Sequence, residues 1–156
     1  DLERIFDAPG AIQLVQAGNL RSSLRMLELA RERAALDRIL VATDTPTGTG
    51  VMPMGMIKTV TEFSSLGGFT ATDALAFATG NAARVLRRDE GVIDVGRPAD
   101  LVLLQAPAGG VATDPLAAIE RGDIPGICGV VIDGEVRALR SRNTPAASRQ
   151  ANLTVG

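Results

Sequence analysis

Ile39-Leu40-Val41-Ala42-Thr43-Asp44 is a short run of apolar and β-branched residues that ends on a carboxylate. Such a run, apolar on both faces, is typical of a buried strand in a parallel sheet. Residues 11–15, Ala-Ile-Gln-Leu-Val, predict an earlier strand of the same kind. Between the two, aliphatic residues recur at helical spacing: Leu20, Leu24, Leu27, Ala30 and Ala34. The order strand, helix, strand predicts an α/β fold with a parallel sheet covered on both faces.

Asp44 follows the second predicted strand directly. In α/β sheets and (β/α)8 barrels, active sites form at the carboxyl ends of the strands. A carboxylate at this position can bind a metal ion or exchange a proton with a water molecule that a metal activates. Aspartates also cap helices and close turns at strand ends. Position alone does not decide between these two roles.

The segment after Asp44 is rich in hydroxyl groups and glycine. It contains neither G-x-G-x-x-G nor a Gly-Lys-Ser/Thr ending, which argues against a nucleotide-binding loop. A glycine backbone can approach a ligand closely and threonine hydroxyls can donate hydrogen bonds. We therefore expect the loop Thr47–Gly55 to contact a substrate. Gln16 and Asn19 follow the first strand on the same edge and are further candidates for orienting substrate.

Two more helices are predicted after this loop. The first begins near Pro53 and ends at Gly67-Gly68, with four residues facing the core: Met56, Ile57, Val60 and Phe63. Thr70 and Asp73 have the spacing of a capping box, with Asp in place of the usual Glu, and begin the second. The apolar stripe of that helix is Leu75, Ala78, Ala82, Val85 and Leu86.

The pattern changes from about Gly91 onward. Short strands punctuated by glycine and proline are predicted at residues 91–93, 100–104 and 129–136. Asp133-Gly134 predicts a tight hairpin turn within the last of these stretches. Residues 115–121 predict a helical turn or two. The polar, proline-bearing last ten or so residues predict an extended arm or a frayed tail.

Composition excludes several classes of protein. The 156 residues include 16 basic and 18 acidic side chains, and the net charge of −2 argues against nucleic-acid binding. The chain has no histidine, so a Ser-His-Asp triad, a Cys-His pair and a histidine metal cluster are impossible within it. One cysteine cannot form an internal disulfide, and no membrane span or signal peptide is visible. We expect a cytoplasmic protein without a membrane partner.

Other chemistry-bearing side chains predict structural roles. Cys128 lies in an apolar stretch, so we expect a buried, inert thiol. Asp100 follows Pro98-Ala99 and predicts a turn-capping carboxylate. A basic edge exposed to solvent or facing a partner is predicted from Arg137, Arg140 and Arg142. Because two parallel strands do not form a stable sheet alone, we expect another polypeptide to cover their apolar faces.

Two stretches carry a resemblance to a known family. Thr79-Gly80-Asn81-Ala82-Ala83 and residues 91–103, Gly-Val-Ile-Asp-Val-Gly-Arg-Pro-Ala-Asp-Leu-Val-Leu, resemble the C-terminal signature of the amidohydrolase superfamily. There a last barrel helix leads into a composite β-sandwich. Residues 43–50, 118–127, 133–135 and 141–145 are most similar to members of the superfamily that hydrolyse cyclic amides. The likeness extends from about Gln16 to Ala147.

The resemblance implies a hydrolase of a cyclic amide C–N bond. Thr43-Asp44 is similar to the end of the superfamily's eighth barrel strand, whose aspartate binds a metal and relays a proton. Asp44 would then be both a catalytic residue and a metal ligand of a site with two divalent ions, zinc or iron. By analogy in position, the substrate side would be lined by Thr45, Thr47, Gly48, Thr49 and Gln16.

The resemblance also implies a division of the chain and a missing part. Residues 1–90 would be the last two β/α units of a (β/α)8 barrel, residues 91–140 strands of the small β-sandwich, and residues 141–156 an extended tail. The superfamily's metal-binding histidines are absent, so the N-terminal portion, as a separate chain or segment, would supply most metal ligands. Homo-oligomers are expected from the family. The alternative is a catalytically inert remnant that serves as a scaffold or binding module.

Overall fold

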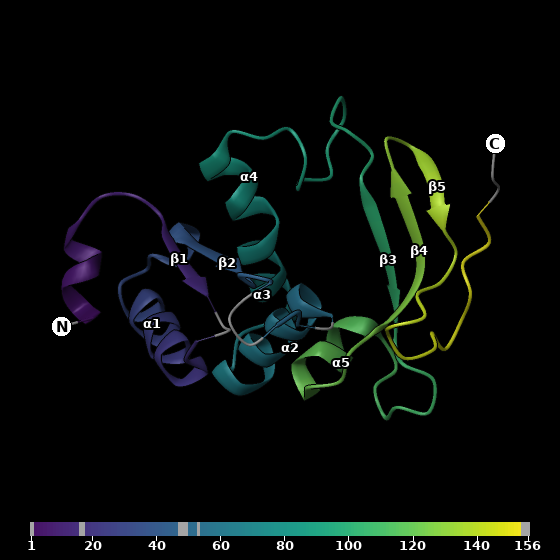
Figure 1. Ribbon diagram of the computed structural model, residues 1–156, viewed down its shortest axis with the longest axis horizontal. Coiled ribbons are helices and arrows are strands. Elements are labelled where there is room, and N and C mark those ends of the chain that lie inside the picture. Colours follow the sequence, from purple (N-terminus) through teal and green to yellow (C-terminus); the bar gives the residue numbers. More distant parts are fainter. Residues whose placement is uncertain (1, 16–17, 47–49, 53, 154–156) are drawn as a thin grey trace.

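A computed structural model describes residues 2–15, 18–46, 50–52 and 54–153 (Figure 1). A 3-10 helix, η1 (Leu2–Asp7), leads into β1 (Ile12–Val15), α1 (Leu20–Glu32), the short η2 (Leu36–Arg38) and β2 (Ile39–Ala42). β1 and β2 pair in parallel, from Ile12 opposite Ile39 to Val15 opposite Ala42. The predicted strand, helix, strand order and the parallel pairing are confirmed.

The apolar stripe of α1 packs against this sheet. Leu27 and Ala30 are fully buried, in one core with Ile39 of β2. Phe63 and Phe77, from the next two helices, complete that core. The predicted stripe is one turn too long, because α1 ends at Glu32 and Ala34 has a left-handed φ of 51°.

Helix α2 (Gly55–Gly67) matches the first predicted helix. Val60 and Phe63 are buried, but the prediction for Met56 is wrong, since its side chain is 38% exposed. Gly68, with a φ of 62°, ends the helix in the left-handed conformation that glycine adopts at low cost. Arg31 of α1 secures that end: its Nη2 donates to the carbonyls of Gly67 and Gly68, at 2.8 and 3.1 Å.

The second predicted helix is in fact two, α3 (Ala71–Ala78) and α4 (Gly80–Leu86), because Thr79 leaves helical geometry at φ −123° and ψ −86°. The break has a tertiary cause. Asn81 Nδ2 donates to the carbonyls of Leu36 and Ile39, each at 2.9 Å, and so holds α4 against the start of β2. Turned this way, α4 leaves Val85 and Leu86 exposed, contrary to the predicted stripe.

Of the two side-chain to backbone hydrogen bonds of a capping box, the described residues show one at the start of α3. Thr70 Oγ1 accepts the N–H of Asp73 at 3.1 Å, as predicted for an N-cap. The same hydroxyl donates to Asp73 Oδ2 at 2.8 Å. Glu120 Oε1, from α5 (Pro115–Arg121), accepts the N–H of Ala71 at 3.0 Å. The first turn of α3 is therefore also satisfied by a side chain from another element.

The C-terminal part contains an antiparallel sheet in the order β3 (Leu101–Gln105), β4 (Gly126–Ile132) and β5 (Glu135–Ala138). Asp133 and Gly134, at φ 52° and 78°, form the predicted turn between β4 and β5. Asp100 Oδ1 accepts the N–H of Asp133 at 2.8 Å, which confirms its structural role. Cys128 is buried, as predicted.

The predicted strand at residues 91–93 is wrong. Gly91 and Val92 form a bend, Ile93 is in no regular element, and its side chain is 87% exposed. A strand needs a partner for its backbone groups, and no other strand pairs with these residues in the part of the chain that the structure describes. By contrast, the predicted arm is partly ordered: Ala108 N–H donates to Ala146 O at 2.7 Å, and Ser148 N–H to Ala106 O at 2.9 Å.

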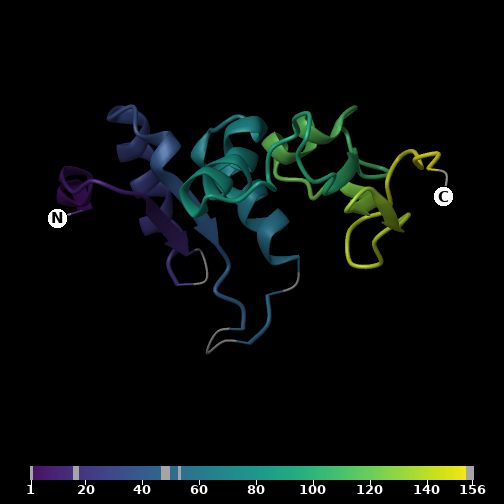
Figure 2. The ribbon, with the colours of Figure 1, turned by 90° about the horizontal axis from the view of Figure 1, so that it is seen from above.

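The helices α2, α3 and α4 lie between the two sheets (Figure 1). Seen from above, the carboxyl ends of β1 and β2 both open on the same side of the molecule, where the chain that leaves β2 projects from the body (Figure 2). No helix in the described ranges is long and apolar enough to cross a lipid bilayer.

Candidate active site at the end of strand β2

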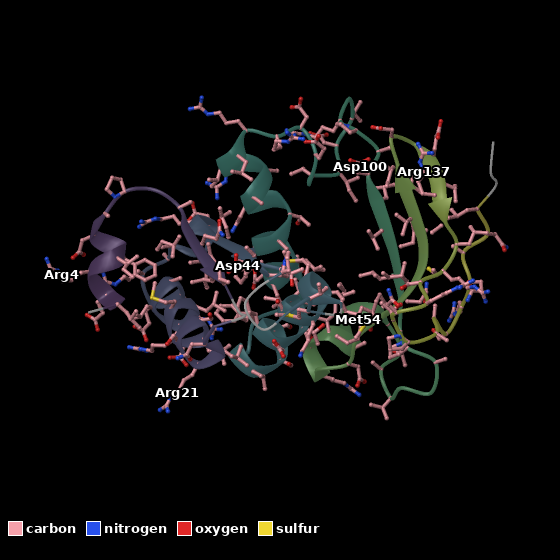
Figure 3. The ribbon with its side chains drawn as sticks, in the orientation of Figure 1. Arg4, Arg21, Asp44, Met54, Asp100 and Arg137 are labelled. Carbon is pink, nitrogen blue, oxygen red and sulfur yellow. The ribbon has the colours of Figure 1, made fainter. Side chains whose placement is uncertain are left out.

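Asp44 lies two residues beyond β2, at the carboxyl end of the parallel pair (Figure 3). The strand is held by burial of Ile39, Leu40 and Val41, whereas Asp44 is exposed. Its φ of 54° is left-handed, a conformation that aspartate tolerates better than most residues. The backbone therefore turns away from the sheet at the residue that carries the carboxylate.

The Asp44 carboxylate is not bound by any other described residue. Among the described residues, no N–H or side-chain donor is within hydrogen-bonding distance of it. The N-cap position of α2 is occupied by Met54 rather than by an acidic residue. The structural alternatives for Asp44, a helix cap or a closed turn, are thus not seen within these residues.

The side chain of Thr45 stabilises the connection between β2 and α2. Its Oγ1 accepts the N–H of Met52 at 3.0 Å, which joins the two sides of the connection between β2 and α2. The hydroxyl proton of Thr45 remains available for a second hydrogen bond. Contact between Thr45 and a substrate therefore stays a prediction.

The other residues predicted to contact substrate either lie outside the described ranges or have a structural role. Gln16, Thr47, Gly48 and Thr49 lie outside the described residues, so their roles also stay predictions. Asn19 is the N-cap of α1, with its Oδ1 accepting the N–H of Ser22 at 3.0 Å. Its position just before an apolar helical stripe is a capping signal that could have predicted this role.

The residues fit one ligand of a metal site and not a whole site. No group of three or more Asp, Glu, Cys or His side chains that could hold a metal occurs in the described ranges. Asp44 contributes one exposed carboxylate with no competing partner among those residues, which suits a hard or borderline divalent cation. A metal site with three or more such ligands would need residues beyond the described ranges.

Two open hollows of about 460 and 320 Å³ lie elsewhere on the surface. The first is lined by residues of η1 and α1, and the second by Gly10, Ala11 and Arg38 with Arg84 and Val85. Gly10 and Ala11 precede β1 and Arg38 precedes β2, so the second hollow is at the opposite end of the strands from Asp44. Neither hollow is part of the candidate site.

Two features of the site escaped prediction. Met54, labelled with Asp44 in Figure 3, also has a left-handed φ of 54°. Gly55 approaches Thr43 so closely that a Cβ added at Gly55 would be 2.9 Å from Thr43 Cγ2. Both depend on the path of the chain in space, and the sequence carries no local signal for either.

Replacing Thr45 by valine is expected to lower the free energy of unfolding by about 0.5–1.5 kcal/mol, the net contribution of one ordinary hydrogen bond. Valine keeps the shape of the side chain but cannot accept the N–H of Met52. Thr45→Ser retains the hydroxyl and is expected to keep most of this stability. Urea denaturation of both variants is the measurement, and equal stability of the two would show that the hydroxyl is dispensable.

Comparison with known proteins gives a consistent result. A model of the amidohydrolase family matches residues 15–137. Enamidase of Eubacterium barkeri is 38% identical over 154 residues, which is 98% of this chain and 40% of the relative. The chain thus spans about 40% of the length of that curated relative.

Solved structures agree. A crystal structure of enamidase superposes with a TM-score of 0.87 and 39% identity, covering 90% of this chain and 36% of that one. A β-aspartyl dipeptidase from Fervidobacterium islandicum superposes with a TM-score of 0.60 over 93% of this chain and 34% of that one. At 19% identity, the second match shows a shared fold alone. The resemblance to the amidohydrolase superfamily found in the sequence is confirmed.

Proposed function

This chain belongs to the amidohydrolase family, and from that membership we propose that it supplies the proton-transferring carboxylate of a metal-dependent hydrolase of cyclic amides. The observation that carries the proposal is the exposed Asp44 at the carboxyl end of a parallel strand. Sequence identity to enamidase over nearly the whole chain supports an amide C–N bond as the target.

The proposed architecture extends the two observed sheets. Residues 1–90 would form the last two β/α units of a (β/α)8 barrel, residues 91–140 part of a small β-sandwich, and residues 141–156 a tail. β1 and β2 each have one neighbour among the described strands, so each leaves an edge for further barrel strands. An N-terminal portion, as a segment or a separate chain, would provide those strands and most metal ligands. We call this whole the complete enzyme.

In the proposed mechanism, divalent ions of the zinc or iron kind supply Lewis-acid activation of water and of the amide carbonyl when bound. Asp44 would be one of their ligands. A carboxylate oxygen of Asp44 accepts the proton of the attacking water and passes it to the leaving nitrogen. That nitrogen needs a proton to depart as an amine. The exposure of Asp44 gives both donor and acceptor access to the same oxygen.

Metal content is the direct test. Native mass spectrometry of the complete enzyme is expected to show about two divalent ions per copy of this chain, the number that activates water in two-metal hydrolases. Removal of the ions by a chelator is expected to abolish hydrolysis of lactams and cyclic imides, and zinc or iron to restore it. The same spectrum would show the homo-oligomer that we propose.

A metal-free particle that hydrolyses no cyclic amide would contradict the proposal. It would favour instead the inert remnant that acts as a scaffold or binding module. The exposed carboxylate at the strand end, which has no partner among the described residues, counts against that alternative, because a scaffold does not need a charge at this position.

A further inference from the structure

The first turn of α2 packs directly against the end of strand β2. A Cβ at Gly55 would be 2.9 Å from Thr43 Cγ2 and 3.4 Å from Thr43 Cβ. Gly55 is the first residue of α2 and has no left-handed φ, so the backbone conformation does not require glycine. The close approach of Thr43 is what requires it.

The other neighbour of Asp44 is held from the same side. Thr45 Oγ1 accepts the N–H of Met52, three residues before α2 begins. Both residues that flank Asp44 are therefore in contact with the segment that leads into α2. Asp44 itself has no hydrogen-bond partner among the described residues, so its backbone decides where the carboxylate lies.

Helix α2 is a firm support for these contacts. Val60 and Phe63 are buried in the protein core, and Arg31 holds the far end of the helix. Asp44 and Met54, at the two ends of the connection, both have left-handed backbones. Residues in such sparsely populated conformations persist when their surroundings over-determine them.

We propose that Thr43, Thr45 and Gly55 are positioning residues that set the place of the Asp44 carboxylate through the contact of β2 with the first turn of α2. This inference rests on the proposed function for its kinetic consequence. The structural part of the inference is that the position of Asp44 depends on the contact between Thr43 and Gly55. That part can be tested without measuring activity.

The test is Gly55→Ala in the complete enzyme. The β-branched side chain of Thr43 is stiff about χ1, so it cannot easily turn away from the added methyl group. The strand end and the helix must move apart. The separation destabilises the fold, but alanine favours helix more than glycine does and offsets part of this cost, so the melting temperature is expected to fall only slightly. We expect kcat to fall about 10- to 100-fold, the cost of small misplacements in active sites, and KM to change by less than about twofold.

A compensating variant and a matched control sharpen the test. Thr43→Ser removes the Cγ2 methyl group that the added methyl group of alanine would meet. The double variant T43S/G55A is therefore expected to recover most of kcat. The T43S single variant completes the double-mutant cycle. Gly80 is also the first residue of a helix, but a Cβ there has nothing closer than Val92 Cγ2 at 3.9 Å. Gly80→Ala is expected to have the wild-type kcat.

Crystal structures of G55A and the double variant give a readout independent of activity. We expect Asp44 to be displaced in G55A and restored in T43S/G55A. An unmoved Asp44 in G55A, or a displaced Asp44 with full kcat, would overturn the inference. If the wild-type enzyme hydrolyses no cyclic amide, the proposed function fails, while the displacement still decides the inference.

Discussion

The complete enzyme is expected to lose activity by a factor on the order of 10²–10⁴ when Asp44 is replaced by asparagine, the usual cost of removing a general acid–base group. Asparagine has nearly the same shape and also tolerates a left-handed φ, so the backbone at 54° is retained. It cannot take a proton from water near neutral pH. Steady-state hydrolysis of a cyclic amide measures the loss, and the melting temperature is expected to be unchanged.

A second aspartate provides the control. Asp94 is exposed, and its Oδ1 accepts the N–H of the adjacent Val95 at 2.8 Å. The amide oxygen of an asparagine can accept the same bond, so Asp94→Asn is expected to retain wild-type activity. If Asp44→Asn stays within a few-fold of wild type, the proton-transfer role assigned to Asp44 is wrong.

Phe63→Ala is expected to have the largest effect on stability, a loss of about 3–5 kcal/mol in the free energy of unfolding. Phe63 is fully buried in the core shared by β1, β2, α1 and α3. Because this interior is closely packed, loss of the phenyl ring leaves a cavity that the neighbouring side chains cannot fill. Urea denaturation of the complete enzyme, followed by circular dichroism, measures the shift.

Leu66 in the same helix is the comparison, since its side chain is 62% exposed. Leu66→Ala also removes apolar atoms, three carbons against the six of Phe63→Ala, but opens no cavity, and is expected to change stability by less than about 0.5 kcal/mol. Similar shifts for the two variants would mean that the buried face of α2 is assigned wrongly.

Local patterns were enough to predict the strand, helix, strand unit at residues 12–42. The strands around Leu14 and Val41 and the helix between them follow from hydrophobic periodicity, which acts over neighbouring residues. The turn at Asp133-Gly134 follows from the backbone preferences of two residues. Asp44 could be singled out because the end of a parallel strand is a known place for functional side chains.

Contacts between distant segments explain what could not be predicted. Thr79 breaks a regular helical stripe because Asn81 bonds to carbonyls more than forty residues earlier in the chain. The segment at Ile93 has a strand-like sequence but no strand beside it in the described chain. Gly55 belongs to a glycine-rich stretch, and only the folded chain shows that it meets Thr43.

The parallel pair of strands has a practical consequence for handling this polypeptide. Within the described residues, β1 and β2 pair with no other strand, so the outer edge of each has backbone N–H and C=O groups without a strand partner. Uncovered edges act as templates for other strands and promote aggregation. Recombinant production is therefore best attempted by co-expression with the N-terminal portion proposed above, so that the strand edges are covered before they pair between molecules.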